Sequence, residues 1–503
     1  MGPVAKPDAE GSGDGAPERR AKIFSWPFSP PAILPRSPRA RAWLVGLALA
    51  VGYLALRTLP PMLAGYEADV RAYERWYERI AVGGVRTVYA RSDFDYPPLY
   101  AYLLWMISKG QHAIEWMTGR PVMLSFPFLL RLWPLTFDLL IGWMLSRLGR
   151  AAEQAAIPSS DAAGTQAIAA KSVPWGWVLP ALYLLNPAVL FDTGYWGQTD
   201  SIHSGFVLGA FLALGWRSRG LTPGRESGPP AWTAWPAWTA WVLLMLGALM
   251  KPIALPYFPL LLVLSVCWHG IRSTLLGMAA ALATFVVLCL PFALPDPVRF
   301  FQEIVMDLGS MPYTSCNAHN LWWVLGPWRP ADEPFIGALT ATDVGHVLFG
   351  VFLLAILVRA WTVALRRELS LGEGIGLAAA VGAGFFMLST HMHENHLFTA
   401  IPLLLPLAVL PWAGGPARTR AVLWVFAGMT AGVFLNMLAH DPWLGMRGPW
   451  AESGGFDPMS RVPTGFRRKA LALLGTGINL VSFGQLVWIV FTRSPVARRL
   501  GSR

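Results

Sequence analysis

Charged residues are scarce in this sequence. Asp, Glu, Lys and Arg make up only 14% of the 503 residues, whereas 54% are hydrophobic and 25 are tryptophan. This balance excludes an ordinary soluble domain. We therefore expect a polytopic membrane protein.

Cysteine is scarcer still. The three cysteines, Cys267, Cys289 and Cys316, are too few and too scattered for a disulfide framework or a thiolate metal site. Acidic residues are fewer than basic ones, which gives a formal charge of +11. The basic residues lie in short clusters between apolar runs rather than along one polar face, so we expect no nucleic-acid partner and interpret them as topology signals.

Long apolar runs predict an all-α bundle of about twelve transmembrane helices, with amphipathic helices in the first outer loop. The first run is Trp43–Leu59, and it follows a disordered basic tail, residues 1–40, that we expect to be retained and cytoplasmic. The other runs are 128–148, 174–191, 201–216, 233–250, 253–268, 273–292, 343–361, 374–390, 397–412, 420–438 and 470–491. Pro97–Met106 is interpreted as an interfacial or re-entrant helix.

The positive-inside rule orients these runs. It places the short basic clusters in the cytoplasm and the loops 192–200 and 389–396, which contain no Lys or Arg, outside the cell membrane. The predicted organisation is a tail (1–40), an N-terminal transmembrane module (41–292) with a first outer loop (57–97), an outer loop (293–342), a C-terminal transmembrane module (343–491) and a basic cytoplasmic tail (492–503).

The first outer loop supplies acidic candidates. Residues 65–80, GYEADVRAYERWYERI, predict an amphipathic helix on the outer surface with its aromatic side chains at headgroup depth. Most of its acidic residues have arginine neighbours at helical spacing, but Asp69 stands near the exit of the first run, where a carboxylate could meet a substrate hydroxyl. Asp95 and Tyr96 precede a double proline, so Asp95 either caps a turn or contacts a sugar.

Further polar residues interrupt apolar sequence at the same predicted face. Arg131 and Asp138 face the same way on one helix and either compensate each other or point to a site. Lys251 either snorkels or pairs with a phosphate. The candidates for sugar or acceptor contacts in two further loops are Trp196, Gln198, Asp200 (which could instead be a helix N-cap), Asn317 and Asn320.

The stretch Leu388–His396, LSTHMHENH, gathers three histidines and Glu394 within six residues. Such a cluster is costly at the edge of a bilayer. Its spacing is H-E-x-H, one residue short of the H-E-x-x-H motif, which excludes that class of zinc protease. A metal site of other geometry, a structural cluster, and a pair of imidazoles that binds phosphate, His391 and His393, remain open.

The order of these motifs resembles the GT-C superfamily of integral-membrane glycosyltransferases, most closely bacterial relatives of the dolichyl-phosphate-glucose and mannose transferases. The resemblance covers residues 43–412 and implies that Asp69 is the catalytic base and that His391, His393 and Glu394 bind the donor phosphate. The family often has a basic residue after this motif, where the present chain has Asn395. The resemblance therefore implies that Lys251 or Arg131 neutralises the phosphate.

The expected activity is inverting transfer of a hexose, glucose or mannose, from a polyprenyl-phosphate carrier to an extracytoplasmic glycan, glycolipid or polymer. We expect a monomer in the cell membrane, with no certain cofactor, although a divalent cation is possible. A flippase or transporter of lipid-linked sugars is the alternative, and it predicts polar groups spread through the depth of the membrane.

Overall fold

Helices dominate the described part of the chain. The computed structural model describes residues 2, 44, 46–48, 51–54, 65–90, 94–122, 124–155, 173–215, 237–307, 312–410, 415–441 and 466–492. Every element named below lies in one compact unit, residues 49–503. Most of the predicted terminal tails and most of the first predicted span lie outside the described residues.

Among the described residues, six helical stretches are long and apolar enough to cross a membrane, which is consistent with an all-α membrane protein. They are α4 (Phe126–Leu130) with α5 (Leu132–Ala155), η5 (Pro252–Tyr257) with α10 (Phe258–Ala293), α13 (Ala341–Leu365), α14 (Leu371–Leu388), α16 (Gly415–His440) and α17 (Phe466–Phe491). Shorter apolar helices are α6 (Trp175–Leu184), α8 (Asp200–Gly215), α9 (Trp238–Met250) and the run of η6 (His396–Thr399), α15 (Ala400–Leu404) and η7 (Leu405–Ala408). The total of about twelve spans stays a prediction.

Helix α14 is the most enclosed of the six candidate spans. Within its apolar window 83% of the residues are buried, against 17% for α13. Its glycines explain the close packing: a Cβ atom on Gly382 would lie 2.1 Å from the hydroxyl of Tyr257, and one on Gly384 would lie 2.2 Å from the ring of Phe352. The tightly held end of α14 therefore fixes the start of the histidine-rich segment that follows it.

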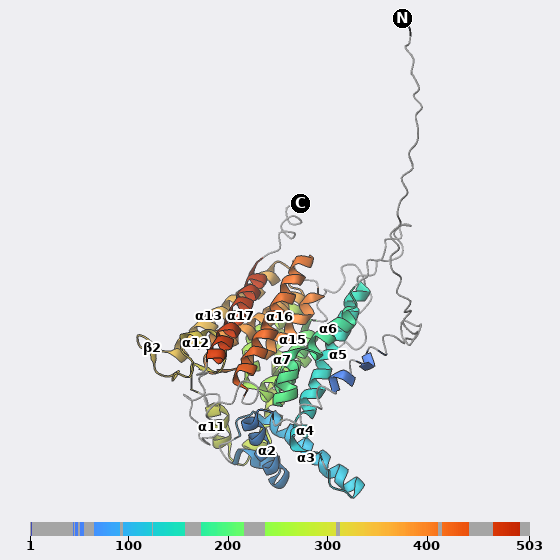
Figure 1. Ribbon diagram of the computed structural model, residues 1–503, viewed down its shortest axis with the longest axis vertical. Coiled ribbons are helices and arrows are strands. Elements are labelled where there is room, and N and C mark those ends of the chain that lie inside the picture. Colours follow the sequence, from blue (N-terminus) through green and yellow to red (C-terminus); the bar gives the residue numbers. More distant parts are fainter. Residues whose placement is uncertain are drawn as a thin grey trace, which may run out of the picture. The chain divides into compact units, whose positions relative to one another are not determined.

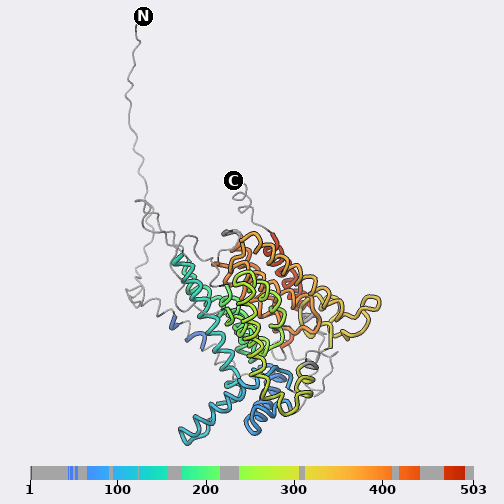
Figure 2. Tube along the Cα trace, turned by 180° about the vertical axis from the view of Figure 1, so that it is seen from behind, coloured from blue at the N-terminus to red at the C-terminus, as the bar shows by residue number. Residues whose placement is uncertain are grey.

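Several elements gather at one end of the bundle (Figure 1, and from behind in Figure 2). They are α2 (Glu67–Gly83), η2 (Val85–Ala90), α3 (Pro98–Thr118) and α11 (Pro297–Asp307). Helix α2 is amphipathic, with Val70, Tyr73, Trp76 and Ile80 buried at helical spacing. Tyr73 and Trp76, two of its aromatic residues, pack into an aromatic cluster within the protein, because α3 covers that face. Their depth relative to the lipid headgroups stays a prediction.

Two short strand pairings complete this end. Strand β1 (Ser315–Cys316) pairs in parallel with β4 (Met392–His393), and β2 (Pro334–Ile336) pairs with β3 (Leu339–Thr340) in an antiparallel hairpin. The register places Cys316 opposite His393, and an isolated bridge adds Asn317 to the same partner. The loop before α12 (Leu321–Leu325) is thus bonded to the histidine-rich segment.

Candidate active site

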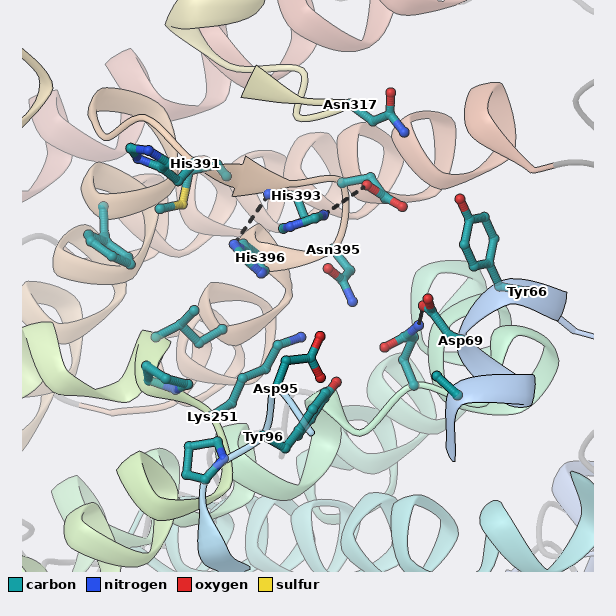
Figure 3. A pocket seen from close by; sticks show the side chains of 18 of the residues that line it. Tyr66, Asp69, Asp95, Tyr96, Lys251, Asn317, His391, His393, Asn395 and His396 are labelled. Carbon is teal, nitrogen blue, oxygen red and sulfur yellow. Dashed lines mark hydrogen bonds and ion pairs between the residues drawn. The ribbon is translucent and has the colours of Figure 1, made fainter. Parts of the chain in front are cut away.

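A cavity of about 550 Å³ lies at this end of the bundle. Its lining residues come from segments that are far apart in the sequence, within 66–76, 95–97, 198, 251–256, 304, 317–328 and 385–396. Figure 3 shows Asp69 on one side of the cavity, His393 on the other, and Asn395 between them. The acidic helix and the histidine-rich segment therefore face one shared space.

Most of the site residues predicted from the sequence line this cavity. They are Asp69, Asp95, Tyr96, Gln198, Lys251, Asn317, His391, His393 and Glu394. Four others do not line it, namely Arg131, Trp196, Asp200 and Asn320. The cavity also has lining residues that the sequence did not single out as site residues, among them Tyr66, Tyr73, Trp328, Asn395 and His396.

Asp69 lies in the first turn of α2 and is half-buried. Its Oδ2 accepts a hydrogen bond of 2.5 Å from the side-chain amide of Gln198. Gln198 reaches it because Gly197 adopts a left-handed conformation (φ 77°) that ends the short π-helix η3 (Leu190–Trp196), which follows α7 (Pro187–Val189). A carboxylate held by an amide beside an open cavity is suited to accept a proton from a bound hydroxyl group.

Lys251 supplies a positive charge to the cavity. Its ammonium group lies 3.0 and 3.1 Å from the two carboxylate oxygens of Asp200, which is fully buried behind the wall. Burial lowers the pKa of Lys251, but the charge of Asp200 outweighs that effect and the net pKa is raised, so the group stays protonated. The side chain of Asn395 donates to the same Asp200 carboxylate at 2.7 Å, so an amide helps to hold the pair.

The histidine-rich segment is fixed by its backbone. The amide of His391 donates to the carbonyl of Tyr313 at 3.0 Å, and His391 itself has a left-handed φ of 63°. The amide of His393 donates to Nδ1 of His396 at 3.3 Å. Burial, and then the neighbouring Lys251, lowers the pKa of His396 well below its usual 6.5, and burial also lowers the pKa of His391. These two imidazoles are therefore neutral hydrogen-bonding groups at neutral pH.

Helix α16 supports both walls from behind. Asn436 accepts from the amide of His319 at 2.8 Å and donates to the carbonyl of Asn317 at 2.6 Å. Asp441, the first residue after α16, accepts from the indole of Trp196 at 2.8 Å. Trp196, a predicted sugar contact, therefore has its polar atom directed away from the cavity and toward α16. Asn320 caps α12 through the amide of Trp323.

Arg131, a predicted ligand of the donor phosphate, is buried and binds backbone carbonyl groups. It donates to Gly194 and Tyr195, each at 2.6 Å, and also to Pro127. The chain before α2 packs against this contact, because a Cβ atom on Gly65 would lie 2.8 Å from the Tyr195 carbonyl and 2.9 Å from the Arg131 guanidinium. Arg131 thus holds the loop that carries Gln198 and packs directly against the residue that leads into α2.

Replacing Arg131 with methionine is therefore expected to lower stability rather than donor affinity. The loss leaves buried carbonyl groups without their donor, and a hydrogen bond from a charged group contributes about 1.5 to 3 kcal/mol. The unfolding temperature in detergent measures the effect, and Arg75→Met, at an exposed position of α2, is the control. An Arg131→Met protein with an unchanged unfolding temperature and a raised KM for the donor would instead make Arg131 a phosphate ligand.

Metal binding was one interpretation of the histidine cluster. Among the described residues, no group of three or more His, Cys, Asp and Glu side chains is arranged to hold a metal ion. Glu394 lies beside His393, with its carboxylate 3.9 Å from Nδ1 of that histidine.

Comparison with models of protein families gives no match for this sequence, and comparison with curated proteins gives none either.

Proposed function

We propose that the protein is an inverting glycosyltransferase that moves a hexose, glucose or mannose, from a polyprenyl-phosphate carrier to a glycan, glycolipid or polymer acceptor. The observation that carries the proposal is that Asp69 and the residues Lys251, His391 and His393 line one cavity at the end of an apolar helical bundle. A carboxylate facing a cluster of phosphate-binding groups across one cavity suits transfer of a sugar from a phosphate to a hydroxyl group.

The proposed reaction is a single displacement. The acceptor oxygen attacks the anomeric carbon while Asp69 takes its proton, and the bond between that carbon and the phosphate oxygen breaks with its electron pair on the phosphate. The departing lipid phosphate gains negative charge, which the ammonium of Lys251 and the imidazoles of His391 and His393 stabilise. One displacement inverts the configuration at the anomeric carbon.

The remaining lining residues suit a sugar and a lipid. Asp95, Tyr96 and Asn317 offer hydrogen-bonding groups for sugar hydroxyls, and aromatic faces such as that of Trp328 suit sugar C–H groups. One wall is apolar and is formed by residues of η5 together with Phe385. We assign the acidic side to the acceptor and the side with Lys251 and the apolar wall to the lipid-linked donor.

The orientation belongs to the same proposal. We place the N-terminus in the cytoplasm and the cavity outside the cell membrane, because the basic clusters lie in the loops of the opposite face in the positive-inside assignment. A monomer suffices for the chemistry, because the described residues of one chain supply the base and the phosphate-binding groups.

The full chain in lipid vesicles tests the activity. Polyprenyl-phosphate glucose and mannose with a radiolabelled sugar serve as donors, and a membrane glycolipid fraction serves as the acceptor, with and without a chelator. Label should move into the acceptor with inverted anomeric configuration. Movement of intact donor across the bilayer without transfer would make the protein a transporter, and loss of transfer with the chelator would reveal a divalent cation requirement.

A further inference from the structure

Gln198 is buried at the edge of the cavity, and both polar atoms of its side chain are engaged. Its Nε2 donates to Asp69, and its Oε1 accepts from the hydroxyl of Tyr73 at 3.2 Å. Its backbone amide donates to the carbonyl of Asp192 at 3.0 Å. The amide group therefore has one orientation, with its donor toward Asp69.

Tyr73 extends this chain of hydrogen bonds. Its hydroxyl also lies 3.0 Å from the hydroxyl of Tyr96. A phenol has one proton to donate, and Tyr73 donates it to Gln198, so Tyr96 must donate to Tyr73. Burial, followed by the nearby Tyr96 and Asp69, raises the pKa of Tyr73 well above 10, so it remains a donor throughout the neutral range. The bonds run in one direction from Tyr96 to Asp69.

We propose that Gln198 and Tyr73 are positioning residues for the base. They fix the rotation of the Asp69 carboxylate and keep it ionised, so that it meets the acceptor hydroxyl in one geometry. The inference rests on the proposed function, in which Asp69 takes the acceptor proton. A donor to the charged form of a carboxylate favours that form, and the amide donor gains rigidity from Tyr73.

The aromatic cluster provides a matched control. Tyr100 is a buried phenol whose ring centroid lies 5.4 Å from that of Tyr73 and 4.7 Å from that of Tyr96. Its hydroxyl makes no hydrogen bond within the described residues, and Tyr100 does not line the cavity. Tyr73→Phe and Tyr100→Phe thus each remove one phenolic oxygen from the same aromatic cluster. Only Tyr73→Phe breaks the series of hydrogen bonds that leads to Asp69.

Transfer kinetics with radiolabelled polyprenyl-phosphate glucose or mannose test the inference in the full-length protein. Gln198→Leu should lower kcat about 10- to 100-fold and Tyr73→Phe about 10-fold or less, since hydrogen bonds to charged groups contribute more than neutral ones. Both variants should move the acidic limb of the pH profile to higher pH, because a carboxylate that loses a donor is protonated more easily. The KM for the donor should not change, and Tyr100→Phe should match the unmodified protein.

A spectroscopic measurement tests, without turnover, whether Gln198 and Tyr73 keep Asp69 ionised. The infrared difference between the unmodified protein and Asp69→Asn isolates the carboxyl band of Asp69, whose titration midpoint should rise in Gln198→Leu and Tyr73→Phe but not in Tyr100→Phe. Equal midpoints in all of these proteins would overturn the inference, whatever the function. An active Asp69→Asn protein would overturn the proposed function instead, even if the midpoints move.

Discussion

Replacing Asp69 with asparagine is expected to lower the rate of hexose transfer by about 100- to 10,000-fold, the range that a positioned general base contributes. An amide has almost the shape of a carboxylate but cannot take the proton of the acceptor hydroxyl. Its oxygen can still accept the hydrogen bond from Gln198, so the cavity should stay intact. Transfer of radiolabel from the lipid-linked donor measures the loss, and the unfolding temperature in detergent should not change.

Glu67→Gln is the control for this prediction. Glu67 lies in the same first turn of α2, but it forms an ion pair with Arg71 at an exposed position and does not line the cavity. The substitution removes the same charge from the same helix end without touching the cavity. Full activity in Asp69→Asn, or an equal loss in Glu67→Gln, would contradict the assignment of Asp69 as the base.

The sequence predicts the helices well because apolar runs report directly on burial in lipid or protein. It also predicts one of their breaks. The runs 253–268 and 273–292 predict two helices, and α10 is indeed two helices that meet at Gly270, which has a non-helical φ of 78° and ψ of 170°. The side-chain oxygens of Ser265 and Thr274, nine residues apart, lie 2.9 Å from each other across this break, which a continuous helix would not allow. A glycine with positive φ allows one helix to end and the next to begin without a long loop.

The residues that face the cavity depend on partners that hydrophobicity does not reveal. Trp196 and Gln198 are two residues apart in the sequence, yet Trp196 donates to Asp441, the residue that follows α16, while Gln198 donates to Asp69. Only the packing of α16 decides this. The sequence does contain one signal for the residues near Asp69: Tyr73 follows it by four residues, so a helix places the two on one face.

Asn395 shows that the sequence also does not reveal where the positive charge of the cavity comes from. In the sequence it stands where the GT-C resemblance leads one to expect a basic residue, so the segment lacks a cation. In the structure its amide donates to Asp200, which also pairs with Lys251. The positive charge at this wall therefore comes from the end of α9, a distant part of the chain, and the amide holds its partner.

Replacing Lys251 with methionine is consequently expected to lower transfer by about 100- to 1,000-fold, as the loss of one group that stabilises developing charge does in other active sites. The raised pKa of Lys251, which Asp200 maintains against the effect of burial, keeps the ammonium charged when the phosphate departs. The KM for the donor should rise as well, because the ground-state phosphate is already negative. Steady-state transfer kinetics with the labelled donor separate the two effects.

Lys251→Met alone is also expected to lower stability, and this effect must be separated from its effect on transfer. It leaves the carboxylate of Asp200 fully buried without its counter-charge, which is expected to lower the free energy of unfolding by about 3 to 5 kcal/mol. Combining Lys251→Met with Asp200→Asn removes both charges and keeps an oxygen that can accept from Asn395, so the unfolding temperature should recover. Transfer should not recover, because the departing phosphate still lacks the ammonium. A double variant that regains both stability and transfer would show that Lys251 acts only as the partner of Asp200.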